Sequence, residues 1–193
     1  GGIVAQSMGQ IRFADQWPVF FGDALPATNR RALEALRELP VSGFTLWPEW
    51  TEQEQRELMP LPLPALCPVY GRERLMILNH CPARVMRGLS EGRESCRFCR
   101  TPDQACGQME PVLRDGRGYA FPLRRTSLPG GCQVNVYNAL PTDLRAFDGE
   151  RRALGAGMLA RFTTEPPEEQ RHLTELFAAL RDGLPVPPAV NAT

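Results

Sequence analysis

Apolar residues along the chain form short runs that alternate with stretches of helical spacing, and this pattern predicts strands followed by helices. The first run covers 17–22 and is bounded by turn residues. Thr28 or Asn29 then caps a helix that Pro40 ends, because proline does not continue one, and its apolar face is formed by Leu33, Leu36 and Leu39. The chain therefore begins with a strand–helix unit.

A second unit of the same kind follows the first. Its strand covers 43–47, and its helix runs from Thr51 to Met59, with Glu54 placed to complete a capping box with Thr51. The segment 60–64 then interrupts the pattern, because its prolines do not fit a helix or a central strand. A strand–helix–strand–helix order is typical of a parallel α/β layer.

The middle of the chain predicts strands without helices. Strands over 65–70 and 75–78 flank a turn at Gly71 and Arg72, and a β-hairpin covers 111–123. A polar, cysteine-rich stretch lies between the second strand and the hairpin. We expect this part to be a small module of its own.

Strand and helix signals alternate again in the last third of the chain. They predict a strand over 133–138, a helix over 141–154, a strand over 157–162 and a helix from Pro166 to Gly183. The α/β rhythm is thus expected to resume after the cysteine-rich part.

This order predicts an α/β protein with a partial (β/α) barrel-like parallel layer, interrupted by an inserted Cys-rich, metal-stapled β-hairpin module. The expected segments are βα units in 1–66, the metal-binding module in 67–132, and further βα units with the C-terminal helix in 133–193. A complete barrel needs about 200 residues or more. We therefore expect an N-terminal remainder of the same protein, or another chain, to complete the layer.

Four of the six cysteines lie close together, with the spacing Cys-x14-Cys-x2-Cys-x6-Cys. Two thiols separated by two residues can reach one ion from a tight turn, and a polar segment without a hydrophobic period has little else to hold it folded. The spacing therefore predicts a metal site whose ligands are Cys81, Cys96, Cys99 and Cys106.

The ligand set and the metal both leave alternatives open. Zinc and a 4Fe-4S iron–sulfur cluster each accept four thiolates, so the spacing does not choose between them, although zinc is our first choice. Cys106 has three possible substitutes, which are Cys132, Cys67 and His80. Buried, redox-active or disulfide-bonded cysteines are the competing interpretation.

Charge is unevenly distributed, although the chain is neutral overall. All 22 basic residues are arginine, and eleven of them lie in 71–125 with only six acidic residues. RNA is a predicted partner of 71–125, while solvated arginines are the simpler interpretation. The sequence has no apolar run long enough to span a membrane and no secretion-signal pattern, so we expect a cytoplasmic protein.

Polar residues stand at the ends of several predicted strands, which is where the chemistry of (β/α) barrels is found. Glu49 and Arg161 are the catalytic candidates, because a carboxylate and a guanidinium can bind or polarise a substrate. Asp23, Tyr137 and Asn138 are predicted to line the substrate. Turn and cap residues are the competing interpretation, above all for Asp23 and Asn138.

Several phrases occur in an order that one protein family shares. They are 70–76 leading to His80-Cys81-Pro82, the stretch 113–122, Cys132 followed by Tyr137-Asn138, and the Trp47-Pro48-Glu49 turn. In this order they resemble the collagenase-like peptidase family U32, and together they cover most of 19–163. The joint order is more specific than any one phrase.

The resemblance implies a barrel-like catalytic domain, with its N-terminal half upstream of this chain, that acts on protein or peptide substrates. Some relatives instead hydroxylate RNA or ubiquinone precursors and carry an iron–sulfur cluster. Their Cys-Tyr-Ser-Gly-x-Cys signature is absent from this chain, so no catalytic residue is carried over. A non-catalytic module that binds nucleic acid is the alternative from a different class.

Overall fold

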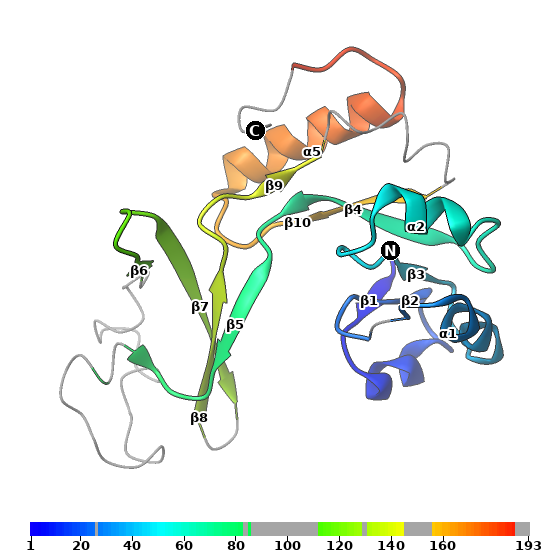
Figure 1. The fold of residues 1–193 in the computed structure, drawn as a ribbon, viewed down its shortest axis with the longest axis horizontal. Coiled ribbons are helices and arrows are strands. Elements are labelled where there is room, and N and C mark those ends of the chain that lie inside the picture. Colours follow the sequence, from blue (N-terminus) through cyan, green and yellow to red (C-terminus); the bar gives the residue numbers. More distant parts are fainter. Residues whose placement is uncertain (26, 83–84, 86–111, 129–130, 145–155, 188–193) are drawn as a thin grey trace. The chain divides into compact units, whose positions relative to one another are not determined.

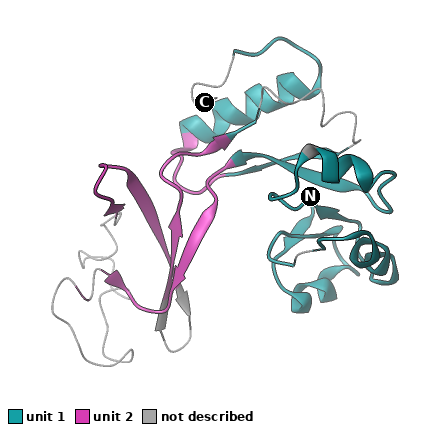
Figure 2. Cartoon of the chain, in the orientation of Figure 1, with its two compact units in different colours: residues 1–70, 143–161, 168–193 teal, residues 71–142, 162–167 magenta. Residues whose placement is uncertain are grey.

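The computed structural model describes residues 1–25, 27–82, 85, 112–128, 131–144 and 156–187. The chain divides into two compact units (Figure 2). Unit 1 comprises residues 1–70, 143–161 and 168–193, and unit 2 comprises residues 71–142 and 162–167. The chain therefore passes between the units four times.

Unit 1 is built on a curled parallel sheet that forms a half-barrel. Four strands pair in chain order, each parallel to the one before: β1 (Ile3–Ala5), β2 (Val19–Phe21), β3 (Gly43–Thr45) and β4 (Ala65–Gly71). β10 (Gly157–Arg161) continues the sheet beyond β4, and the short β9 (Thr142–Asp143) also pairs with β4 (Figure 1). The expected mixed α/β class and partial parallel layer are confirmed.

The helices of unit 1 begin where the sequence predicts caps. Asn29 caps α1 (Arg30–Ala35), accepting a hydrogen bond from the Ala32 N–H at 2.9 Å, and a short 3-10 turn, η2 (Leu36–Glu38), extends it. Thr51 and Glu54 form the capping box of α2 (Glu52–Glu57). The described ranges also contain a 3-10 helix, η1 (Met8–Phe13), and the C-terminal α5 (Pro167–Arg181). In the described ranges, no helix is long and apolar enough to cross a membrane.

The core of unit 1 lies between α1 and one face of the sheet. Leu33 of α1 and Leu36 of η2 pack with side chains that alternate along the strands, namely Phe21, Phe44, Leu46, Ala65 and Cys67. Because successive residues of a strand point to opposite faces, the residues between these belong to the other face of the sheet. In a barrel that other face is the inner one.

Unit 2 contains a four-stranded antiparallel sheet. Its strands are β5 (Arg74–Leu78), β6 (Val112–Arg114), β7 (Ala120–Leu128) and β8 (Gly131–Tyr137), in the spatial order β5-β8-β7-β6. Leu123, Val134 and Val136 form its buried cluster. The hairpin expected over 111–123 is confirmed by the pairing of β6 with β7.

Two expectations for the segment after the cysteines are wrong. The strand predicted at 133–138 is β8, which pairs antiparallel with β5 and β7 rather than joining the parallel layer. Its alternation of valines with polar residues is the sequence pattern of an antiparallel strand, although Asn135 between the two valines is also buried. The helix predicted over 141–154 does not begin at Pro141, because β9 occupies Thr142–Asp143; the rest of that helix lies outside the described residues.

Candidate functional site

Asp23 and Arg161 form an ion pair at the carboxyl edge of the parallel sheet in unit 1. Asp23 stands two residues after the end of β2, and Arg161 is the last residue of β10. The Arg161 Nη1 donates to Asp23 Oδ2, and the two side chains are 26% and 21% exposed. The pair is therefore half-buried and still reachable from solvent.

The pair bridges strands that are not neighbours. β3 and β4 lie between β2 and β10, so the two strand ends would be about 14 Å apart in a flat sheet. The curl of the sheet and the length of the arginine side chain together close this gap. The ion pair consequently joins the chain after β2 to the end of β10, on the edge where parallel sheets bind their ligands.

Gly22 sets the position of Asp23. Its N–H donates to the Ala5 carbonyl at 2.8 Å, and a Cβ added at Gly22 would lie 2.6 Å from that same oxygen and 2.5 Å from Gln6 Nε2. Gln6 Oε1 also accepts from the Ala24 N–H at 3.3 Å. Because only glycine lets the chain come this close to Ala5 and Gln6, the turn that carries Asp23 is held tightly against the end of β1.

The other predicted site residues lie in different elements of the fold. Glu49 is exposed in the turn after β3, which the Trp50 N–H closes by donating to the Trp47 carbonyl at 3.2 Å, and Glu49 has no ion-pair partner among the described residues. Tyr137 ends β8 in unit 2 and is half-buried. The Asn138 side chain accepts from the Ala139 N–H at 2.8 Å, which is a turn-stabilising role.

Most of the predicted metal ligands lie outside the described residues. Cys96, Cys99 and Cys106 belong to 86–111, and the side chain of Cys132 is likewise not described. Cys81 is half-buried and free of any disulfide, Cys67 is buried in the core of unit 1, and His80 is exposed. Among the described residues, no three histidine, cysteine or acidic side chains gather into a metal-binding group.

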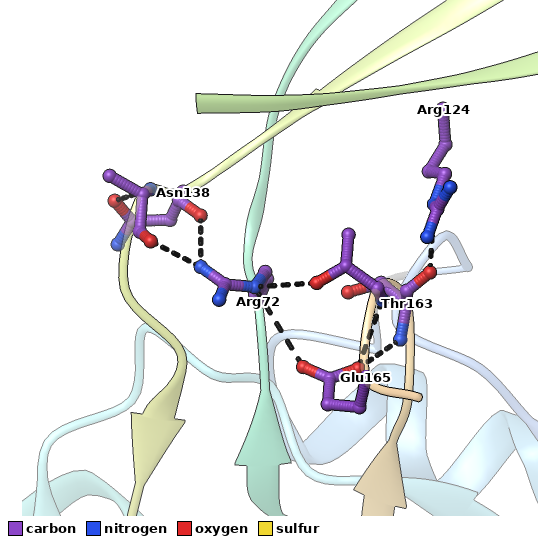
Figure 3. A network of polar contacts seen from close by, with 7 residues as sticks. Arg72, Arg124, Asn138, Thr163 and Glu165 are labelled. Atoms are coloured by element: carbon purple, nitrogen blue, oxygen red, sulfur yellow. Dashed lines mark hydrogen bonds and ion pairs between the residues drawn. The ribbon is translucent and has the colours of Figure 1, made fainter. Parts of the chain in front are cut away.

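A polar network in unit 2 surrounds Arg72 (Figure 3). Arg72 Nη1 donates to the carbonyls of Asn138, at 3.0 Å, and Ala139, and its Nε donates to Thr164 Oγ1 at 3.2 Å. Arg72 Nε also lies 3.7 Å from Oε1 of Glu165, whose side chain is only 2% exposed. These partners are mostly main-chain groups and a buried carboxylate, so Arg72 ties three chain segments together.

Glu165 organises the loop 162–167 from within. Its Oε2 accepts from the main-chain N–H groups of Thr163, at 2.6 Å, and Thr164, at 3.0 Å. Arg124 Nε donates to the Thr163 carbonyl at 2.9 Å (Figure 3). These hydrogen bonds hold the loop 162–167 against Arg72 and Arg124, so we interpret this network as structural.

Three buried side-chain oxygens have no hydrogen-bond partner in the part of the chain that the structure describes: Thr45 Oγ1, Asn135 Oδ1 and Thr163 Oγ1. Thr45 ends β3, between the strands that carry Asp23 and Arg161. In the sequence, Thr45 stands out as the one hydroxyl residue in the apolar run Gly43-Phe44-Thr45-Leu46. The sequence does not show that its hydroxyl lacks a hydrogen-bond partner, because that depends on three-dimensional packing.

Comparisons of the chain with protein-family models, with curated proteins and with solved structures found no significant match. The functional interpretation therefore depends on the geometry of the site and on the family resemblance of the sequence.

Proposed function

We propose that unit 1 forms part of the active site of a barrel-type peptidase, whose protein or peptide substrate binds across the carboxyl edge of the half-barrel. The observation that carries this proposal is the Asp23–Arg161 pair at that edge. Its reachable position agrees with the usual place of ligands in parallel α/β sheets. The substrate class follows the resemblance to the collagenase-like family.

The proposal assigns substrate binding to the pair. Arg161 supplies a guanidinium that can donate to a substrate carbonyl oxygen and stabilise negative charge that develops there. Asp23 orients Arg161 and offers its other carboxylate oxygen to a substrate N–H. Glu49 has no part in this scheme, because it lies exposed in a turn.

The test is cleavage of fluorescein-labelled casein by the protein purified together with the N-terminal remainder that the family resemblance implies. We expect Arg161→Met to lower kcat/KM at least about tenfold, the effect of losing one charge-assisted hydrogen bond to the substrate. Glu49→Gln serves as the matched control, since it removes an exposed charge that has no partner among the described residues, and should leave the rate unchanged. Absence of cleavage by the unmodified protein, or equal rates for Arg161→Met, would contradict the proposal.

A further inference from the structure

Thr45 is a buried hydroxyl residue at the centre of the carboxyl edge. It is the last residue of β3 and only 7% exposed. Its Oγ1 makes no hydrogen bond with any group that the structure describes. Burying a hydroxyl without a partner costs free energy, and such groups are uncommon in folded proteins.

The face of the sheet to which Thr45 belongs follows from its neighbours in the strand. Phe44 and Leu46 both pack in the core with Leu33 of α1 and Leu36 of η2. Thr45 stands between them, so its side chain belongs to the opposite face, which is the inner face of the half-barrel. Thr45 is therefore not part of the helix-covered core.

The strand register places Thr45 beside the ion pair. Phe21 pairs with Phe44 across β2 and β3, so Thr45 is level with Gly22 and one residue below Asp23. On its other side, Thr45 pairs with Leu66 of β4, and Leu66 lies next to Gly157, the first residue of β10, whereas Arg161 is the last residue of that strand. The hydroxyl is therefore level with the part of the edge next to Asp23, the residue to which Arg161 donates.

We infer that Thr45 is a substrate-binding residue whose hydroxyl is reserved for an uncharged amide group of the bound molecule. The inference rests on the proposed function and specifies what its site recognises. The Asp23–Arg161 pair presents an acceptor and a donor side by side and is neutral as a unit. An anion would have to displace Asp23 from Arg161, whereas an amide supplies its own donor and acceptor, and a hydroxyl can serve either one.

The test uses Thr45→Val, which keeps the shape of the side chain and removes the hydroxyl, and Thr45→Ser, which keeps the hydroxyl. We expect Thr45→Val to raise the urea midpoint of unfolding or leave it unchanged, because an unpaired polar group is lost. Its KM for labelled casein should rise about tenfold with little change in kcat, and Thr45→Ser should restore KM. A lower urea midpoint with unchanged KM would show that the hydroxyl is structural and overturn the inference.

A second measurement separates this inference from the proposed function. The probe is N-acetyl-glycinamide, a blocked glycine that carries two amide groups like a dipeptide and is called the dipeptide below. It is titrated into the protein while NMR follows the signals of Thr45. We expect the amide to shift them in the unmodified protein, acetate at equal concentration to leave them unmoved, and Thr45→Val to weaken binding about tenfold. If casein is not cleaved but the dipeptide still binds, only the proposed function fails. If the dipeptide leaves Thr45 unmoved, or binds Thr45→Val equally well, the inference fails.

Discussion

At the scale of single residues, the capping box that begins α2 also shifts the pKa of one of its two members, Glu54. The Thr51 N–H donates to Glu54 Oε2 at 2.7 Å, and the Thr51 hydroxyl donates to the same oxygen at 2.8 Å. These bonds, the main-chain one first, hold the pKa of Glu54 below its ordinary value of 4.5. The ionised carboxylate is therefore favoured by the folded chain.

The depressed pKa of Glu54 predicts a sign for the pH dependence of stability. Because the pKa of Glu54 is lowered in the folded chain, its contribution to the free energy of unfolding is complete above pH 4.5. That contribution is lost as the pH falls through the folded-state pKa. We expect Thr51→Val to move the pKa of Glu54 part of the way back toward 4.5, because the main-chain bond remains. NMR titration of the Glu54 carboxyl carbon measures this. A Glu54 that titrates at or above 4.5 in the unmodified protein would contradict the prediction.

The residues that the sequence predicts correctly are those whose partners are local. Asn29 and Thr51 cap their helices through groups three residues away, so their role is visible in the order of side chains. Asp23 and Arg161 are 138 positions apart. Both were assigned to strand ends, but their pairing depends on the curl of the sheet, which no local pattern encodes.

At the scale of elements, the end of α5 is defined by a glycine in the left-handed region. Gly183 has φ +77°, its N–H donates to the Leu180 carbonyl at 3.1 Å, and the Leu184 N–H donates to the Ala179 carbonyl at 2.9 Å. This pair of bonds is a Schellman motif, which satisfies carbonyls that the helix leaves without partners.

We predict that Gly183→Ala lowers the free energy of unfolding by about 1–2 kcal/mol, because a Cβ is strained in this conformation. Urea unfolding followed by circular dichroism at 222 nm measures the loss. Gly116→Ala is the matched control, since Gly116 does not have positive φ and an added Cβ there meets nothing within 4 Å. Equal effects of the two substitutions would refute the role of Gly183.

Helices and strands are easier to predict from the sequence than the neighbouring strands with which each strand pairs. The strands, the hairpin and the helix starts follow from periodicity and turn residues, and most of them are present. β8 shows the limit: the sequence predicts a strand over 133–138 in the parallel layer, whereas β8 covers Gly131–Tyr137 and belongs to the antiparallel sheet. Its alternating valines indicate one covered face, but which strands lie beside it depends on long-range pairing.

At the scale of the whole molecule, the predicted metal site is open to a direct test. We expect purified protein to retain about one zinc per chain, or iron with visible absorption if the site holds a cluster. Cys96→Ser and Cys99→Ser should each abolish metal retention, while the helicity of unit 1 stays unchanged. Elemental analysis and circular dichroism measure both quantities. Stoichiometric metal in both variants would refute the ligand assignment.

The four passages of the chain between its units constrain how this protein can be recombined. Arg72 belongs to the segment 71–142, whereas its partner Glu165 belongs to 162–167, and part of unit 1 separates them in the sequence. A chimera that exchanges 71–142 alone would pair Arg72 from one parent with the loop that carries Glu165 from the other. Homologous exchange therefore preserves unit 2 only when it transfers both 71–142 and 162–167, so the two segments are expected to be inherited together.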